Sequence, residues 1–355
     1  MREPRRGVID SLVNLARRAP KGAPAVGVTP HTVAWAENKW RLLRFQPPPG
    51  TKQFARPVLF VPSLINRWYV LDLGPGRSLI EWLVARGHEV FCIDWGTPGD
   101  EDRYLTWDDI CGRYLGRAIR TAARLGESGD VHVLGYCLGG TIAAAYVASV
   151  STGRGSRAYG LEAPIASLTA LAAPIDFDHA GIMSTWTRSP AFDVRSIIDA
   201  YGNVPWRLLQ ASFHMLRPTL TAAKAVGVLD RAWDDEFLES FLATEHWGSD
   251  NVSFPGECYA RYIQELYREN RLVRGGFSVE GRPADLGAIR CPVLAISFAD
   301  DHIVPMASAA PLVERVASRD KFLMPMRGGH VGAVVSRKAA DRLWPAMSTF
   351  WADRD

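Results

Sequence analysis

The sequence has few of the features that indicate disulfides, metal sites, membrane spans or nucleic-acid surfaces. Only five of its 355 residues are cysteines, an odd number with no CxxC spacing, so neither a disulfide framework nor a zinc site is indicated. The apolar runs are far shorter than the ~18 residues of a spanning helix. A net charge of +3 is too small for a nucleic-acid footprint. We therefore expect a cytoplasmic protein with no transmembrane segment, metal, cofactor or nucleic-acid partner.

The composition is that of an ordinary globular protein. Hydrophobic residues make up 47% of the chain and charged residues 22%, which excludes wholesale disorder and a fibrous protein. The length allows two domains in series or one α/β domain with an insertion. The sequence contains no internal repeat that would favour one of these possibilities over the other.

Strands and helices are predicted to alternate along most of the chain. Short apolar runs indicate buried strands at 57–62, 88–94, 130–135, 168–173, 291–298 and 321–325. Helical patterns occupy 78–86, 106–125, 141–149, 307–317 and 337–351. This alternation predicts an α/β fold in which a mostly parallel sheet is flanked by helices.

The alternation stops for about a hundred residues in the middle of the chain. Residues 176–270 contain helical and loop patterns rich in tryptophan, which we interpret as a mainly helical cap, or lid, inserted into the fold. The catalytic core would then comprise 57–175 and 271–355. Residues 1–56 would form an N-terminal helix and a linker.

The N-terminal region carries apolar residues at helical spacing, followed by Arg17 and Arg18. Asp10 and Ser11 interrupt the apolar stretch, so a secretory signal is not expected. The pattern predicts a short amphipathic surface helix. The alternative is a helix that binds a membrane surface or a partner protein.

The strongest chemical signal is the segment GYCLGG at 135–140, between a predicted strand and a predicted helix. Glycines two residues before and after Cys137 permit the tight turn of a nucleophile elbow, the hallmark of α/β hydrolases. A thiol at the start of a helix is favoured as the thiolate by the helix dipole. The sequence therefore predicts an α/β-hydrolase fold with Cys137 as nucleophile. A buried cysteine in a glycine-rich turn is the alternative.

An elbow of this kind requires an acid and a histidine later in the chain, in that order. Asp300 and Asp301 follow the predicted strand 291–298, and His330 follows the predicted strand 321–325 on a glycine-flanked loop. His330 is the expected base, with its tautomer fixed by a carboxylate. Spacing alone does not decide between the two aspartates.

Acyl transfer also requires an oxyanion hole. One N–H is expected from Leu138, directly after the nucleophile, and a second from the loop after the strand 57–62, where Leu64 is the candidate. No GxxxxGK[ST] and no strand-bound GxGxxG occurs, so a nucleotide-phosphate cradle is not supported.

Several further segments resemble the catalytic subunit of polyhydroxyalkanoate synthases. The matching stretches are VPSLINRWYVLDL at 61–73, SLIEWLVARGHEVF at 78–91, IDWGTP at 93–98, GYCLGGT at 135–141, WGSD at 247–250, YRENRL at 267–272, DHIVP at 301–305 and GH at 329–330. The short N-terminal region is most similar to the two-subunit synthases. An ordinary esterase would share only the elbow and its partners.

The resemblance implies an acyltransferase that polymerises 3-hydroxyacyl-CoA into a polyester and releases CoA through an acyl-cysteine intermediate. It assigns Cys137 as nucleophile, His330 as base and Asp301 as acid. The implied partners are the CoA substrate, the growing polyester chain and a second synthase subunit, with a homodimer left open, at the surface of a polyester granule in the cytoplasm. The alternatives are a cysteine-dependent thioesterase or depolymerase and a non-catalytic granule-associated protein.

Overall fold

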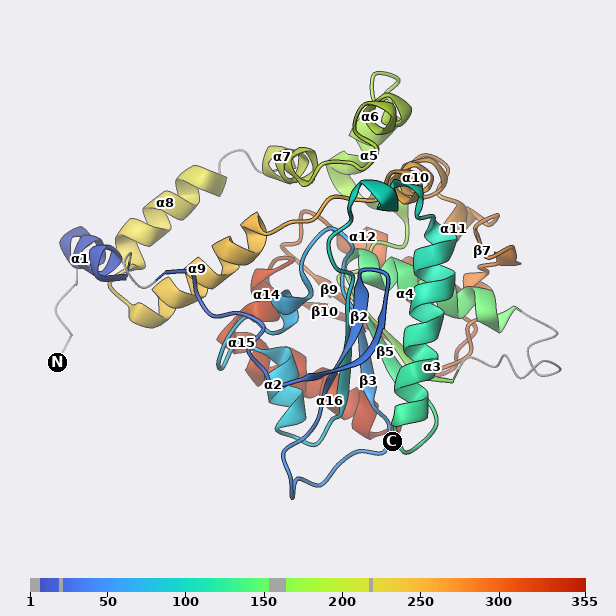
Figure 1. The fold of residues 1–355 in the computed structure, drawn as a ribbon, viewed down its shortest axis with the longest axis horizontal. Helices are drawn as coiled ribbons and strands as arrows, with labels where there is room; N and C mark the ends of the chain where they lie inside the picture. The colour runs from blue at the N-terminus through green and yellow to red at the C-terminus, as the bar shows by residue number, and fades with distance from the viewer. Residues whose placement is uncertain (1–6, 19–21, 153–163, 217–219) are drawn as a thin grey trace.

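The centre of the structure is an eight-stranded, mostly parallel sheet (Figure 1). The computed structural model describes residues 7–18, 22–152, 164–216 and 220–355. The strand order is β1-β2-β4-β3-β5-β6-β9-β10. The strands are β1 Thr32–Glu37, β2 Trp40–Phe45, β3 Val58–Val61, β4 Val90–Asp94, β5 Val131–Tyr136, β6 Ile165–Leu171, β9 Val293–Phe298 and β10 Lys321–Met326, with a separate hairpin of β7 Ser278–Val279 and β8 Arg282–Pro283.

The six strands predicted from the sequence are confirmed as β3, β4, β5, β6, β9 and β10. Each pairs in parallel with its neighbour. Every residue of β3, β4, β5 and β9 is buried. Strands covered on both faces carry continuous apolar runs instead of an alternating pattern, which explains why these segments were recognisable. The predicted fold class is confirmed.

Two strands that the sequence analysis did not predict extend the sheet at one edge. The hairpin of β1 and β2 joins the sheet through antiparallel pairing of β2 with β4. The hairpin turns at Asn38, whose φ of 53° is a conformation that asparagine tolerates. No residue of β1 is fully buried, so this edge strand lacks a continuous apolar run. The interpretation of 32–45 as part of a linker is therefore wrong.

Helices cover both faces of the sheet (Figure 1). The α-helices are α1 Val8–Arg18, α2 Leu79–Val84, α3 Leu115–Leu125, α4 Leu138–Ser151, α5 Gly181–Arg188, α6 Val194–Tyr201, α7 Trp206–Leu216, α8 Leu220–Arg231, α9 Asp235–Ser249, α10 Gly256–Arg261, α11 Arg271–Arg274, α12 Met306–Ala309, α13 Pro311–Arg315, α14 Gly332–Val335, α15 Arg337–Asp341 and α16 Leu343–Ala352. The 3₁₀ helices are η2 Trp68–Leu71, η3 Asp100–Tyr104, η5 Phe177–His179 and η7 Leu286–Ala288, and π-helical turns form η4 Asp108–Tyr114 and η6 Tyr262–Arg268.

Alternate residues of each central strand enter two separate hydrophobic cores. In β3, Leu59 and Val61 belong to the core that contains side chains of α3 and α4, while Val58 and Phe60 belong to the core that contains side chains of α2 and α16. This division follows from the two-residue period of a strand. The two cores hold the sheet rigidly between helices, and the carboxyl ends of its strands provide a fixed base for the elbow.

A long helical segment separates β6 from β9. It includes α5 to α11, and the parallel pairing of β6 with β9 brings the chain back to the same sheet. In Figure 1, α5, α6 and α10 lie beyond one end of the strands, and α7, α8 and α9 extend to one side together with α1. The insertion therefore lies over the end of the sheet from which the loops after β5, β9 and β10 emerge.

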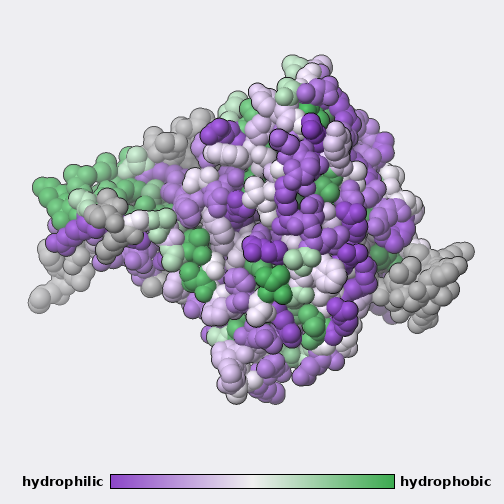
Figure 2. Space-filling view, viewed as in Figure 1, coloured by the Kyte–Doolittle hydropathy of each residue, from purple (hydrophilic) through white to green (hydrophobic). Residues whose placement is uncertain are grey.

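The N-terminal helix α1 packs beside α8, and its polar side chains are hydrogen-bonded to the turn that follows α8. Ser11 is fully buried and its Oγ accepts a hydrogen bond from the backbone N–H of Trp233, while Asn14 donates to the carbonyl of Ala232. The apolar residues Val8, Ile9, Leu12 and Val13 are exposed. Figure 2 shows hydrophobic surface at this outer end of the molecule. The predicted amphipathic helix is confirmed, with its apolar face outward.

Within residues 7–18, 22–152, 164–216 and 220–355, no helix is both long enough and apolar enough to cross a bilayer.

Two buried histidines lie at the amino ends of the central strands, away from the elbow. His88 and His132 are each 1% exposed, and each has one ring nitrogen hydrogen-bonded to a serine, Ser348 or Ser167. The other ring nitrogen of each has no partner among the described residues. Burial lowers the pKa of both histidines to about 4.

We expect the free energy of unfolding to fall between pH 6.5 and pH 4. The unfolded chain protonates His88 and His132 near pH 6.5, whereas the folded chain resists protonation until about pH 4. Stability is therefore fully present above pH 6.5, and about 3 kcal/mol per histidine is lost by pH 4. Urea midpoints measured across this range check the expectation. The double variant His88→Gln/His132→Gln should flatten the pH dependence, and the exposed His179→Gln should not; equal slopes in all three proteins would contradict it.

Candidate active site

Cys137 stands on a sharp turn between β5 and α4. Its backbone has φ 55° and ψ −129°, a conformation that costs a non-glycine residue about 1–3 kcal/mol. The turn is held by a hydrogen bond from the Cys137 N–H to the carbonyl of Leu171 and by one from the Gly140 N–H to the carbonyl of Cys137, each 2.9 Å long. Cys137 is partly exposed, whereas Cys92, Cys111 and Cys258 are buried. The structure thus presents this thiol where the strands end.

Two glycines of the turn are required by close packing. A Cβ on Gly135 would lie 2.3 Å from Cα of Gly140, and one on Gly139 would lie 1.9 Å from the carbonyl oxygen of Val61. Neither neighbour is a flexible side chain, so no other residue fits without moving backbone. The contact at Gly139 also fixes the start of α4 against the end of β3. The loop after β3 therefore begins beside the elbow.

His330 and Asp301 lie beside the elbow on loops after β10 and β9. His330 Nδ1 is 2.7 Å from Asp301 Oδ2, and the His330 ring is also hydrogen-bonded with Cys137. Asp301 is held in turn by the backbone N–H groups of Ile303 and Val304, both 2.8 Å from Oδ1. The structure therefore brings together three of the side chains that the sequence singled out, in a nucleophile–base–acid arrangement.

The surroundings of His330 favour its protonated form. Burial by itself lowers the pKa of His330, but the negative charge of the Cys137 thiolate and the hydrogen bond with Asp301 outweigh it and raise the pKa to about 10. At neutral pH the imidazole then keeps its proton. The arrangement can supply a thiolate nucleophile and, on the adjacent ring, the proton for a leaving group.

The neighbouring Asp300 occupies a different position. It is exposed, and its Oδ2 accepts a hydrogen bond of 3.3 Å from the N–H of Gly328. The Asp300 N–H donates to the carbonyl of Gly328 over 3.0 Å. Asp300 thus joins the loop after β9 to the loop before His330, and only Asp301 contacts the imidazole.

Tyr136, which the sequence analysis did not single out, also supports His330. The two rings stack with their centroids 5.4 Å apart, and the Tyr136 hydroxyl donates a hydrogen bond of 3.2 Å to the His330 carbonyl. Burial raises the pKa of Tyr136 well above its usual value, so the hydroxyl stays a donor. In the sequence, only its position directly before Cys137 indicates that Tyr136 lies at the site.

Leu138 and Leu64, the two residues expected to supply backbone N–H groups, lie on segments that follow adjacent strands of the sheet. Leu138 begins α4, and the first N–H groups of a helix have no acceptor within the helix. Val61 pairs with Gly135, so the loop that carries Leu64 and the elbow leave the sheet from adjacent strands. Both leucines are buried.

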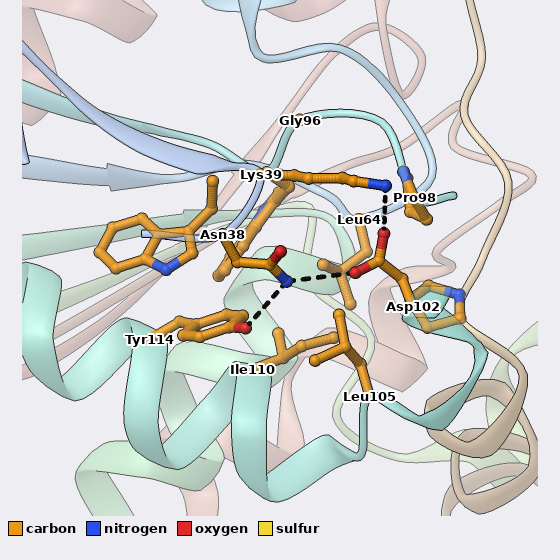
Figure 3. A pocket seen from close by; sticks show the side chains of 12 residues that line it. Asn38, Lys39, Leu64, Gly96, Pro98, Asp102, Leu105, Ile110 and Tyr114 are labelled. Atoms are coloured by element: carbon orange, nitrogen blue, oxygen red, sulfur yellow. Dashed lines mark hydrogen bonds and ion pairs between the residues drawn. The ribbon is translucent and has the colours of Figure 1, made fainter. Parts of the chain in front are cut away.

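The side chain of Leu64 lines a small pocket (Figure 3). Asp102 binds Lys39 there, with 2.9 Å between Nζ and Oδ2, and accepts a hydrogen bond of 3.1 Å from Asn38. The pocket, about 30 Å³, has room for little more than a water molecule. These contacts of Asp102 join the β1–β2 turn to η3.

The loop that carries Leu64 is tied to the end of the inserted helices. The Val252 N–H donates to the carbonyl of Ile65 over 3.1 Å, and the Asn66 side chain donates to Asn251. The indole N–H of Trp247 donates to the Arg67 carbonyl over 2.9 Å. Sequence reasoning did not find these contacts because they join segments about 180 residues apart.

A pocket of about 150 Å³ opens beside Cys137 and His330. Its walls come from both the core and the insertion: Asn66, Tyr136, Cys137, Gln210, Phe213, His214, Trp247, Gly248, Asn251, Ile303, His330 and Val331. Apolar side chains with a few amide groups are typical of a small-molecule site. The insertion contributes α7 and α9 to this wall, so the pocket is closed on one side by helices outside the sheet.

Two protein-family models match the chain. The model described as the N-terminus of poly-beta-hydroxybutyrate polymerase (PhaC) matches residues 22–83, and the model described as the alpha/beta hydrolase fold matches residues 56–333. The second covers most of the chain and includes the elbow, Asp301 and His330.

Curated relatives are identical to the chain at about a third of the aligned positions. A poly(3-hydroxyalkanoate) polymerase subunit PhaC from Haloferax mediterranei is 32% identical over 332 residues, which is 93% of this chain and 65% of that protein. PhaC subunits from Thiocystis violacea and Allochromatium vinosum are each 32% identical, over 92% of this chain and 89% and 90% of those proteins. The chain thus spans just under two thirds of the first relative and most of the other two.

Solved structures with the same fold are more distant in sequence. An esterase from Thermogutta terrifontis is 15% identical with a TM-score of 0.53, covering 91% of this chain and 97% of its own. A monoacylglycerol lipase from Paleococcus ferrophilus is 16% identical with a TM-score of 0.51, covering 90% and 100%. These likenesses confirm the predicted α/β-hydrolase fold.

Proposed function

The chain belongs to the poly(3-hydroxyalkanoate) polymerase family of acyltransferases, built on the α/β-hydrolase fold, and from this we propose that it joins 3-hydroxyacyl units from CoA thioesters into a polyester. CoA is released, and the acyl group passes through a thioester on Cys137. The single observation that carries this proposal is the position of the Cys137 thiol on the strained elbow, hydrogen-bonded with an imidazole that Asp301 orients.

In the first step the thiolate of Cys137 attacks the carbonyl carbon of the CoA thioester. The oxyanion that forms would accept hydrogen bonds from the N–H groups of Leu138 and Leu64. The bond between the carbonyl carbon and the CoA sulphur then breaks, and the leaving thiolate takes the proton held on His330. One thioester replaces another, so the acyl group stays activated on the enzyme.

In the second step a hydroxyl group attacks the acyl-cysteine. Neutral His330 takes the proton from the 3-hydroxyl of the next unit or of the chain end. The oxygen of that hydroxyl then forms the ester bond with the carbonyl carbon. The carbon–sulphur bond to Cys137 breaks, which restores the thiolate and the imidazolium. Water in place of the alcohol would hydrolyse the intermediate, so the site must be shielded.

We assign that shielding to residues 176–270, the proposed cap between the two parts of the core, 57–175 and 271–355. Support comes from α7 and α9, which form one wall of the pocket at Cys137. Excluding water from an acyl-enzyme is a general use of such covering segments. We further propose that the protein works in the cytoplasm at the surface of its insoluble product. The relatives' printed name, a polymerase subunit, supports a second subunit as partner, and a homodimer is the alternative assembly.

The direct test is an assay with 3-hydroxybutyryl-CoA, with and without a candidate second subunit. We expect CoA release accompanied by polymer, because an alcohol is the acceptor in the second step. Free thiol is measured colorimetrically and polymer by gas chromatography after methanolysis. Release of free 3-hydroxybutyrate in place of polymer would identify a thioesterase. Absence of any acyl-enzyme would leave a non-catalytic role at the granule.

A further inference from the structure

A second, larger cavity opens beside the pocket that contains Cys137. Its volume is about 520 Å³, within the range of cavities that hold drug-sized ligands. The two spaces share lining residues, among them Gln210, Trp247 and His330. The outer walls are formed by α8 and α9 of the insertion, through Lys224 and Thr244. A molecule held at Cys137 can therefore extend outward along α9.

The charges around the larger cavity do not suit a CoA nucleotide. CoA carries a diphosphate and a further phosphate, groups that proteins bind with arginine, lysine or helix N-termini. The described lining side chains include no arginine, and the lysine, Lys224, is paired with Glu245 over 2.5 Å. A second carboxylate, Asp300, lies in the same wall. Three histidines also line the cavity, His214, His302 and His330, and His330 lies at the shared end beside Cys137. Apart from these, the lining side chains offer a phosphate no unpaired arginine or lysine, which favours a neutral occupant over a polyanion.

Several polar groups of the lining are already hydrogen-bonded within the protein. Thr244 Oγ1 donates to the carbonyl of Ser240 over 2.8 Å, and Ser249 Oγ donates to the carbonyl of His246 over 2.9 Å. Gln210 donates to the carbonyl of Gly248. A wall whose donors are occupied binds a chain of esters weakly. Weak binding suits a product that must advance by one unit at each turn of the reaction, because a tightly held chain would stall.

We propose that this cavity receives the growing polyester and leads it outward along α8 and α9, and that the CoA nucleotide does not enter it. The inference rests on the proposed function and extends it by giving the product chain its own path. Side-chain donors that are already hydrogen-bonded accommodate an uncharged polyester, and a lysine already paired with Glu245 offers the phosphates of CoA no free partner. The cavity is therefore an exit for product and not an entrance for substrate.

The test fills the outer cavity with the full-length Thr244→Trp variant. Thr244 lines the larger cavity but not the pocket at Cys137. The matched control is Gly227→Trp on α8, where a Cβ meets no atom within 4 Å and which does not line either space. Each protein is mixed with 3-hydroxybutyryl-CoA. The first release of CoA, one per active site, is followed by rapid quench, and chain length is measured by size-exclusion chromatography.

Thr244→Trp is expected to keep the rate and amplitude of the first CoA release. It should make polyester chains about tenfold shorter, because the larger side chain narrows the cavity and so opposes the entry of each further unit. Gly227→Trp should match the wild type in both. Loss of the first release in a folded Thr244→Trp protein would show that substrate enters here, and unchanged chain length would show that no chain passes; either result overturns the proposal. Should tryptophan prevent folding, Thr244→Leu gives the same comparison with a smaller side chain. If the wild type itself releases no CoA and forms no polymer, the proposed function is refuted, and the proposed exit path is refuted with it.

Discussion

Replacing Cys137 by alanine is expected to abolish CoA release from 3-hydroxybutyryl-CoA and to leave no acyl group on the protein. The thiolate is the only atom in the proposed first step that forms a bond to the carbonyl carbon. Losing the nucleophile of such a hydrogen-bonded set costs at least about 10⁴-fold in turnover. The measurement is the rate of thiol release, together with mass spectrometry of the intact protein after brief exposure to substrate.

The chain offers a matched cysteine as control. Cys291 is partly exposed and lies outside the pocket, and burial raises its pKa to about 11, so it is not a thiolate at neutral pH. Cys291→Ala should retain wild-type activity. Covalent acyl trapped on the Cys137→Ala protein would refute the assignment of the nucleophile. Retained circular dichroism would separate loss of chemistry from loss of fold.

The second large effect is expected at the acid. Asp301→Asn should reduce kcat/KM by about 10²–10⁴-fold, because an amide neither fixes the required imidazole tautomer nor stabilises the imidazolium. The variant should also lower the pKa of His330 from about 10, since the hydrogen bond with Asp301 helps to raise it. In NMR spectra recorded as a function of pH, the His330 ring signals of the variant should then titrate at a lower pH than those of the wild type.

Asp300→Asn is the control next to it in the chain. Asp300 contacts the backbone of Gly328 and not the imidazole, so we expect turnover within a few-fold of wild type and an unchanged titration of the His330 ring signals. Equal losses from the two substitutions would contradict the assignment of Asp301 as the acid. A large loss from Asp300→Asn alone would reverse it.

The parts of the fold that could be predicted from the sequence are those whose signal is local. Buried parallel strands are apolar throughout, so β3, β4, β5 and β9 stand out against the helices between them. The elbow is equally local, since its glycines flank Cys137 within five residues. The edge strand β1 is half exposed and lacks such a run, which is why its place in the sheet became visible only in the structure.

The parts of the site that could not be predicted depend on contacts between distant segments. Spacing left Asp300 and Asp301 equivalent, and only the resemblance to a family separated them before the structure showed which one contacts His330. The stacking of Tyr136 on His330 and the tie between Asn66 and Asn251 join residues more than 180 positions apart. Neither residue pair carries a sequence pattern that indicates its partner.

The hydrogen bonds between the loop after β3 and residues 247–252, at and after the end of α9, set a rule for engineering this protein. The inserted helices look like a module that could be exchanged for those of a relative with another product. Yet the segment 247–252 holds residues 65–67 in place through Trp247, Asn251 and Val252. A transplant that ends before residue 247 keeps that support, whereas one that includes the segment must bring its matching loop from the same donor.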